Sequence, residues 1–312
     1  MEEARPPRFA IVCDSGCDLP LDNLEAAGVA MVPLVVRTAG KEHRDCIDLE
    51  PNDFFVRFSA IKGQVDSFAP SQDAFLEVYQ RLADEGHEEI ISLHVSSLAR
   101  DAYDIARAAA DKVEGARVHV VDSRCVSSQM ALVLARLVSD RDNGVCVAAA
   151  LKRIGEASLA ARILVIPAPD AKPRLRGYTK ARSGVLGRVD SLRARAIGVR
   201  RVFCIDDDGA AQELYRSTEL HVLAGRMARS MSWYARKVGP LTYVELTAGA
   251  PRLLPTLEKP LDTNEFESTR AAVISTNPST TTQLGIGAVG IAYVPSSLVT
   301  PLEAARLMGA VE

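Results

Sequence analysis

The sequence has no apolar run that approaches the ~18 residues of a membrane span. Its opening segment, residues 1–7, is acidic and contains no apolar core, which argues against a signal peptide. The formal net charge is only -3, so an electrostatic preference for nucleic acid is not expected. Together these absences predict a cytoplasmic protein with no integral membrane segment and no nucleic-acid partner.

Cysteine is also scarce, with six residues scattered over 312 positions. Only Cys13 and Cys17 are close, in a C-x3-C spacing with no second pair, which is poor support for a zinc site. We therefore expect reduced thiols and no bound metal. Hydrophobic residues make up 47% and charged residues 25% of the chain, as in globular proteins, and the length suits two modest domains.

The common signatures of catalysis and cofactor binding are missing as well. There is no P-loop, G-x-S-x-G or H-E-x-x-H pattern. Residues 285–290 fit G-x-G-x-x-G, but a dinucleotide site needs a following helix and an acid about 20 residues further on. Residues 291–295 favour a strand instead, so we expect no cofactor.

What the sequence does contain is a strand–helix–strand pattern. An apolar run at residues 90–95 predicts a buried strand, helical spacing at 101–113 predicts a helix, and 118–121 predicts a second strand. Two strands that are joined through a helix in this way are expected to lie parallel in one sheet, with a right-handed crossover. Ser96 and Ser97 fall between the first strand and the helix, where exposed N–H groups favour an anion.

The rest of the chain predicts a series of strands and helices around this unit. Strands are expected at residues 9–13, 29–36, 162–166, 241–246, 272–275 and 286–294, with a hairpin of 201–205 and 210–215. Helices are expected at residues 21–27, 51–61, 127–138, 145–154, 218–237 and 260–270, and one more after a cap at Ser71.

Two polar segments and one aromatic group complete this prediction. Residues 41–50 and 275–282 are expected to form loops, with His43 and Asp45 exposed in the first. The side chains of Phe54, Phe55 and Phe58 recur at helical spacing and are compatible with core packing or with the wall of an acyl tunnel.

A cluster of prolines near residue 170 predicts a domain boundary. We expect a parallel-sheet α/β domain with flanking helices over residues 1–165. A smaller α/β domain with a mixed or antiparallel sheet would follow over residues 166–312. Residues 172–201 carry ten Lys or Arg and one acid, which is compatible with solvated helix faces or with a docking surface for an acidic partner.

Four motifs have the order and spacing of a known family. They are F-A-I-V-C-D-S-G-C-D-L-P from residue 9, S-F-A-P-S from 67, I-I-S-L-H-V-S-S from 90 and V-H-V-V-D-S-R-C-V-S from 118. These motifs resemble the DegV family, bacterial carriers that hold a fatty acid for phosphorylation by a partner kinase. The C-terminal segment that contains residues 285–290 is similar to the closing motif of the same family.

The resemblance implies a set of ligand-binding residues. Ser67 takes the place of a threonine whose hydroxyl contacts the ligand carboxylate, although a turn serine bonded to its own backbone is also compatible. On the same resemblance we expect ligand contacts at Ser96 and Ser97, at Arg216 after the hairpin, and at Thr282 in the C-terminal motif.

Four positions depart from the family pattern, among them Ile286, which replaces a proline. Arg100 replaces a serine and Asp101 a glycine; Arg100 would contact a carboxylate or phosphate, or else be a solvated arginine with Asp101 supporting the helix N-terminus. Gln283 replaces a histidine and cannot ionise, so ligand affinity is expected to be nearly constant from about pH 6 to 8. His94, by contrast, is expected to be a core residue whose polar ring atoms are hydrogen-bonded.

These observations predict a two-domain α/β protein that binds a long-chain fatty acid between its domains. It would present the carboxylate to a fatty acid kinase subunit for phospholipid synthesis and perform no chemistry alone. A carrier of another amphipathic anion and a degenerate interaction subunit are the alternatives. An enzyme would need an acid–base pair, for which only His94 and Asp101 are weak candidates.

Overall fold

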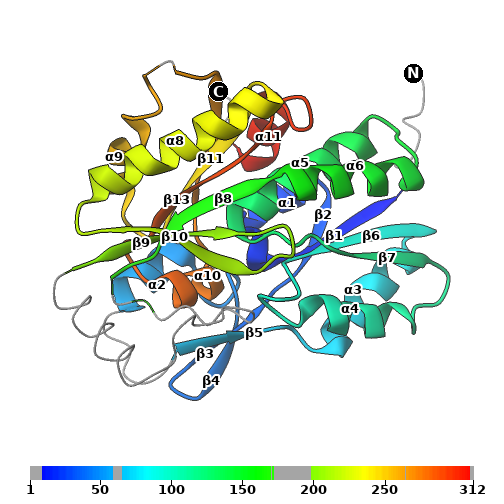
Figure 1. Cartoon of the computed structure of the whole chain (residues 1–312). Helices are drawn as coiled ribbons and strands as arrows, with labels where there is room; N and C mark the ends of the chain where they lie inside the picture. The colour runs from blue at the N-terminus through cyan, green and yellow to red at the C-terminus, as the bar shows by residue number, and fades with distance from the viewer. Residues whose placement is uncertain (1–8, 59–64, 170, 172–197, 264, 310–312) are drawn as a thin grey trace.

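A computed structural model describes residues 9–58, 65–169, 171, 198–263 and 265–309. Two large sheets with helices around them, and one small sheet, make up the molecule (Figure 1). Most of the basic segment expected at residues 172–201 lies outside the described residues. Within the described part of the chain, no helix is both long and apolar enough to cross a membrane.

The first sheet contains four parallel strands in the order β2-β1-β6-β7. Its strands are β1 (Ala10–Asp14), β2 (Val29–Val32), β6 (Glu89–His94) and β7 (Arg117–Asp122). The helix α4 (Ala102–Ala110) crosses between β6 and β7, which pair in parallel from Glu89 with Arg117 to His94 with Asp122. The predicted strand–helix–strand unit is therefore confirmed.

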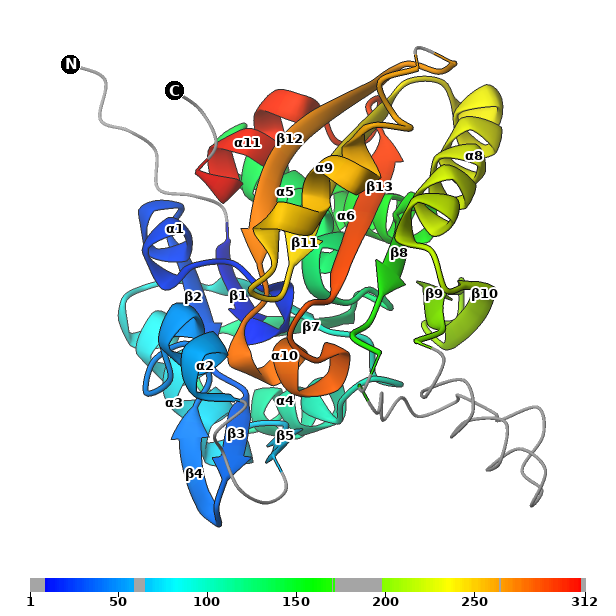
Figure 2. The same ribbon diagram turned by 90° about the vertical axis from the view of Figure 1, so that its left-hand side faces the viewer.

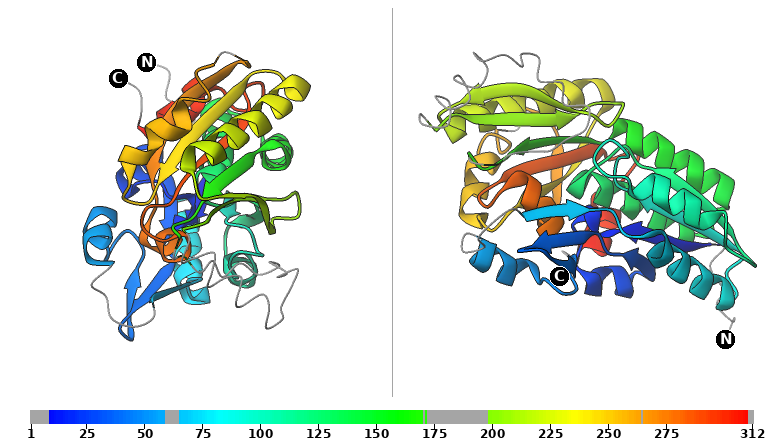
Figure 3. Two further views of the ribbon diagram at one scale, coloured as in Figure 1. Left: turned by 60° about the vertical axis from the view of Figure 1, so that its left-hand side comes forward. Right: turned by 90° about the horizontal axis from the view of Figure 1, so that it is seen from below.

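Helices cover both faces of this parallel sheet (Figures 1 and 3). They are α1 (Leu21–Ala26), α3 (Gln72–Asp84), α5 (Ser127–Asp142) and α6 (Val147–Ala160), with α4 beside α3. As predicted, Ser71 caps α3, because its hydroxyl accepts from the backbone N–H of Ala74. In α5, 12 of the 16 residues are buried, since this helix packs against α6 and against the strands of the other large sheet.

The second large sheet has six strands in the order β10-β9-β8-β13-β11-β12. These are β8 (Arg162–Ile166), β9 (Arg200–Ile205), β10 (Ala211–Ser217), β11 (Leu241–Thr247), β12 (Ser268–Ser275) and β13 (Val289–Pro295). Every pairing is antiparallel except β11 with β12, so the expected mixed sheet is confirmed. The boundary after residue 165 stays a prediction, and the strand that ends at Ile166 is already part of this sheet.

Helices α8 (Leu220–Val238) and α9 (Leu254–Glu258) pack on one face of the six-stranded sheet (Figure 2). The helix predicted at residues 260–270 is wrong, because β12 begins at Ser268 and pairs along β11. The polar loop predicted at 275–282 is also wrong, since α10 (Pro278–Leu284) forms there. Its Ser and Thr residues are poor helix formers, so tertiary contacts rather than propensity must stabilise it. A final helix, α11 (Pro301–Met308), follows β13.

The third sheet is a small antiparallel one in the order β4-β3-β5. It contains β3 (Val35–Thr38), β4 (Lys41–Arg44) and β5 (Val65–Phe68), and it extends away from the large sheets (Figure 2). The single strand predicted at 29–36 is therefore wrong: Pro33, which has no N–H, separates β2 from β3. The loop predicted at 41–50 is partly a strand, because Ala39 and Gly40 both have positive φ and close a two-residue hairpin.

Candidate functional site

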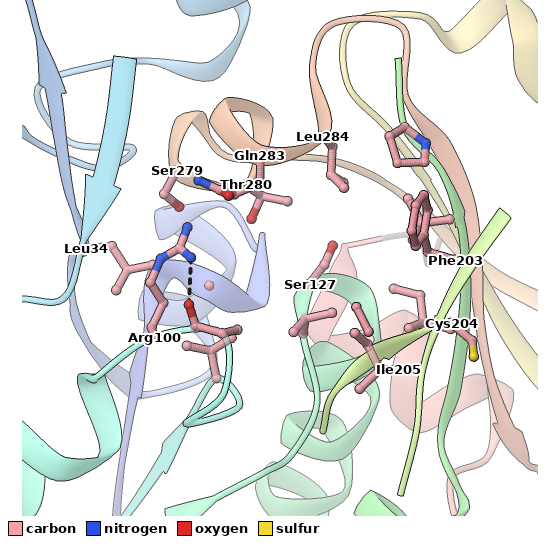
Figure 4. A pocket seen from close by; sticks show the side chains of 18 residues that line it. Leu34, Arg100, Ser127, Phe203, Cys204, Ile205, Ser279, Thr280, Gln283 and Leu284 are labelled. Atoms are coloured by element: carbon pink, nitrogen blue, oxygen red, sulfur yellow. Dashed lines mark hydrogen bonds between the residues drawn. The ribbon is translucent and has the colours of Figure 1, made fainter. Parts of the chain in front are cut away.

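A cavity lies where the carboxyl ends of the parallel strands face the six-stranded sheet. The parallel sheet contributes the turns after β1 and β6 and the start of α5, whereas β8, β9 and α10 form the opposite side. In Figure 4, Arg100, Ser279, Thr280 and Gln283 gather at one end, and Phe203 lies at the other. Ligands commonly bind at this edge of a parallel sheet.

The polar end is built around the side chain of Arg100. Its Nη2 donates to the hydroxyl oxygen of Ser67 over 2.6 Å, and its Nη1 donates to the carbonyl oxygen of Ala99 over 2.8 Å. Burial lowers the pKa of Arg100, and nearby carboxylates oppose that shift. An arginine keeps its charge in proteins, so this end of the cavity holds a fixed cation.

Three of the predicted residues converge on Arg100. Ser67 Oγ lies 3.1 Å from Thr282 Oγ1 and from the carbonyl oxygen of Ser279, and Gln283 Nε2 donates to Thr282 Oγ1 over 3.2 Å. Arg100 and Gln283 line the cavity, and the hydroxyls of Ser67 and Thr282 lie one hydrogen bond behind them. These four side chains form one continuous polar group.

Three other predicted residues have partners elsewhere. Ser96 is buried and donates to the carbonyl oxygen of Gly209, where an added Cβ would lie 2.5 Å from its hydroxyl. Ser97 Oγ donates to Asp122 Oδ2 over 2.6 Å. Arg216 pairs with Glu213 at 2.7 Å on the β9–β10 hairpin. None of the three is among the described residues that line the cavity, and their ligand contacts stay predictions.

The prediction that Asp45 is exposed is wrong. Its side chain is fully buried and accepts from Ser15 Oγ at 2.6 Å and from the N–H and hydroxyl of Ser279 at 2.9 and 2.5 Å. Asp45 directly follows β4, and the next residue, Cys46, has a positive φ of 52°. Burial raises the pKa of Asp45 to about 6, although its hydrogen bonds oppose the shift.

A second buried acid, Asp18, has a similar environment. It accepts from Ser127 Oγ at 2.5 Å and from the backbone N–H of Asn277 at 2.8 Å. Burial raises its pKa to about 7, and the bonds from Ser127, Asn277 and Thr280 oppose that change. Both Ser127 and Ser279 line the cavity. Sequence reasoning missed these two serines, because no local pattern shows which hydroxyls reach a cavity formed by distant segments.

His94 is a core residue, as predicted. It is fully buried, its Nδ1 lies 3.0 Å from Asp14 Oδ2, and its Nε2 lies 2.7 Å from Ser92 Oγ. The edge of its ring contacts Phe75. Because both ring nitrogens are engaged, neither is left for Asp101, the partner considered for an acid–base pair.

Much of the apolar lining of the cavity comes from the second sheet and from α10. These side chains are Ile163 and Val165 of β8, Phe203 and Ile205 of β9, and Leu284 at the end of α10. The aromatic residues Phe54, Phe55 and Phe58 of α2 (Pro51–Phe58) are not among the described lining residues. Phe54 is buried and packs edge-on against Phe58 at 5.2 Å, which favours the core alternative for this pair.

Sequence comparisons identify relatives of the chain. The profile of the DegV family, a family of uncharacterised proteins, matches residues 8–296. A DegV domain-containing protein of Listeria monocytogenes is 29% identical over 130 residues, which are 41% of this chain and 46% of that protein. One from Staphylococcus aureus is 30% identical over 144 residues, which are 46% and 50% of the two chains. The chain thus spans about half the length of the curated relatives it matches.

Solved structures share the fold at low identity. A DegV family protein of Thermus thermophilus, described by its fatty acid binding, superposes with a TM-score of 0.76 and 20% identity over 92% of this chain and 99% of that one. A stearic acid-binding protein of Eubacterium ventriosum superposes with a TM-score of 0.76 and 18% identity, and the match covers 94% of this chain and 99% of that one. At such identities the likeness establishes the fold. Together with the profile match over residues 8–296, it shows that the chain belongs to the DegV family.

Proposed function

We propose that this protein binds a long-chain fatty acid in the cavity between its sheets. The carboxylate would lie at Arg100 and Gln283, and the tail would lie along the wall formed by β8 and β9. The observation that carries this proposal is one fixed cation at the end of an otherwise largely apolar cavity. The fatty acid binding described for structurally similar proteins supports the same ligand class.

The tail would supply most of the affinity. Burying about 16 carbons at ~0.8 kcal/mol each corresponds to roughly 12 kcal/mol before the costs of association. Arg100 and its hydroxyl neighbours would then set the orientation of the ligand rather than dominate the binding free energy. This division of roles suits a carrier, because the head group stays at a defined place while tails of different lengths are accepted.

We further propose that the bound fatty acid is presented to a partner kinase, which phosphorylates the carboxylate for phospholipid synthesis. The polar group around Arg100 contains an arginine, hydroxyls and an amide, and the hydrogen bonds that join these side chains include no carboxylate or imidazole that could serve as a general base. The protein would thus supply substrate position, and the partner would supply the phosphoryl group.

Mass spectrometry of ligand released from freshly purified, denatured protein tests the binding proposal. We expect a saturated or unsaturated long-chain fatty acid, and thermal stabilisation of ligand-free protein when such an acid is added back. Release of a different amphipathic anion would favour a carrier of that anion. A protein with no lipid and no stabilisation by fatty acids would be an interaction subunit, and the proposal would be wrong.

A further inference from the structure

Two serine hydroxyls that line the cavity, those of Ser127 and Ser279, are already engaged as donors. Ser127 donates to Asp18 Oδ2 and Ser279 donates to Asp45 Oδ2, each over 2.5 Å. A serine hydroxyl has a single proton to donate. As long as both acids are ionised, these two serines can offer an incoming anion only lone pairs, which repel it.

The acids have an unusually crowded electrostatic environment. Asp45 faces Ser15, Ser279, Arg100 and Cys46, and Asp18 faces Asp45 as well as its own hydrogen-bond donors Ser127, Asn277 and Thr280. Asp14, which is held by His94, and Asp101 also act on Arg100. Arg100 therefore already interacts with four carboxyl groups before any ligand carboxylate arrives.

We infer that the anionic head group binds together with one proton taken up by Asp18 or Asp45, which releases the hydroxyl of Ser127 or of Ser279 to donate to the ligand. This inference rests on the proposed function. A proton from solvent adds to the carboxylate, and the new acid O–H donates to the serine oxygen. The serine O–H then rotates towards the ligand carboxylate. One ligand charge and one proton enter together, so the buried charge of the site is unchanged.

The direction of the pH effect follows from the same geometry. Burial has raised the pKa of Asp18 to about 7 and that of Asp45 to about 6, and the negative charge of a bound carboxylate would raise both pKa values further. Proton uptake on binding means that affinity increases as the pH falls through this range, by up to about tenfold per pH unit for one linked proton. The nearly constant affinity expected from Gln283 alone is therefore revised.

Calorimetry with dodecanoate, in two buffers that differ in ionisation enthalpy, measures the proton uptake directly. At pH 7 we expect the intact protein to take up a substantial fraction of one proton per ligand. Dodecanol, which has the same chain and no charge, should bind without this uptake. The variants Ser127→Ala and Ser279→Ala should lose affinity several-fold at pH 6 and little at pH 8, because only the protonated site uses these hydroxyls.

Ser128→Ala is the matched control, since Ser128 is buried beside Ser127 but is not among the described cavity-lining residues. Its affinity profile should follow that of the natural protein. Dodecanoate binding with no proton uptake, and serine variants with unchanged profiles, would overturn the inference and leave the proposed function intact. Failure of dodecanoate and longer acids to bind at any pH would overturn the proposed function itself. Circular dichroism of each variant separates a binding defect from a folding defect.

Discussion

The guanidinium of Arg100 donates to the hydroxyl oxygen of Ser67 over 2.6 Å and so joins the turn after β6 to strand β5. Ser67 accepts this bond and has its own proton available for the carbonyl oxygen of Ser279 or for Thr282. Three segments of the chain therefore fix the orientation of one cation. A ligand carboxylate placed there would meet a positioned guanidinium rather than a freely moving one.

Arg100→Ala is expected to weaken fatty acid binding by about 1.5–3 kcal/mol, the range for hydrogen bonds that involve a charged group. This corresponds to roughly a 10- to 150-fold increase in Kd. Fluorescent fatty acid displacement measures it. Arg44→Ala provides the comparison, because Arg44 is 62% exposed and pairs with Asp48 away from the predicted site residues. Equal losses for the two variants would remove the special role given to Arg100.

Ser67→Ala is expected to weaken fatty acid binding less, by about 1 kcal/mol, because Ser67 acts by holding the guanidinium of Arg100 in place. A double-mutant cycle with Arg100→Ala separates this indirect effect from any direct contact. We expect a coupling free energy of about 0.5–1 kcal/mol, because an effect that acts only through Arg100 cannot exceed the loss caused by Ser67→Ala alone. Strictly additive losses would show that Ser67 contributes to binding independently of Arg100.

Asp18 should make the stability of the ligand-free protein depend on pH. Its pKa in the folded protein, about 7, is raised above the ordinary value of an aspartate, so protonation favours the folded state. Its contribution to stability is complete below the unfolded pKa and is lost as the pH rises through about 7. We expect the free energy of unfolding, from urea titrations, to fall between pH 5.5 and 8 with a slope of up to ~1.4 kcal/mol per pH unit.

Asp18→Asn should flatten this slope. Asp48→Asn is the control, because the pKa of Asp48 is shifted in the opposite direction. Hydrogen bonds from Arg44 lower this pKa to about 2, so the contribution of Asp48 to stability is lost only in acid. Its slope between pH 5.5 and 8 should match that of the natural protein. A slope that survives Asp18→Asn unchanged would assign the titration to another group, with Asp45 the next to substitute.

Gln283→His is expected to add a second titration to ligand binding. Gln283 lines the cavity, and an imidazole there becomes a cation near its reference pKa of ~6.5. Affinity for a fatty carboxylate should then increase more steeply below about pH 6.5 than in the natural protein. Parallel Kd measurements between pH 5.5 and 8 test this. Superimposable profiles would place Gln283 away from the bound head group.

Local patterns predicted the parallel unit well. The apolar run that forms β6 and the helical spacing of α4 are encoded within a few residues, and burial on both sheet faces makes the pattern clear. The resemblance also identified Ser67, Arg100, Thr282 and Gln283, which the structure brings together. These residues were recognisable because each lies within a motif of the family.

Features that depend on distant partners were not predictable. The short helix α10 is rich in Ser and Thr, and it is held by contacts with Asp18 and Asp45, more than 200 residues earlier. Asp45 follows a polar hairpin, so its sequence neighbourhood indicates exposure, and only Ser15 and Ser279 explain its burial. Ser127 and Ser279 were missed for the same reason, since no local pattern marks the lining of a shared cavity.

The bonds that the backbone N–H groups of Asn277 and Ser279 donate to Asp18 and Asp45 also bear on the order in which the chain is synthesised. Asp18 and Asn277 are 259 residues apart in the sequence, and Asp45 and Ser279 are 234 residues apart. At translation rates of about 5–20 residues per second, the acids emerge roughly 10–50 s before the groups that cover them. During that interval both carboxylates are hydrated, and the edge of the parallel sheet beside them lacks α10. A nascent chain halted before residue 277 would therefore expose this edge to chaperones and proteases, and release of the last segment would close it.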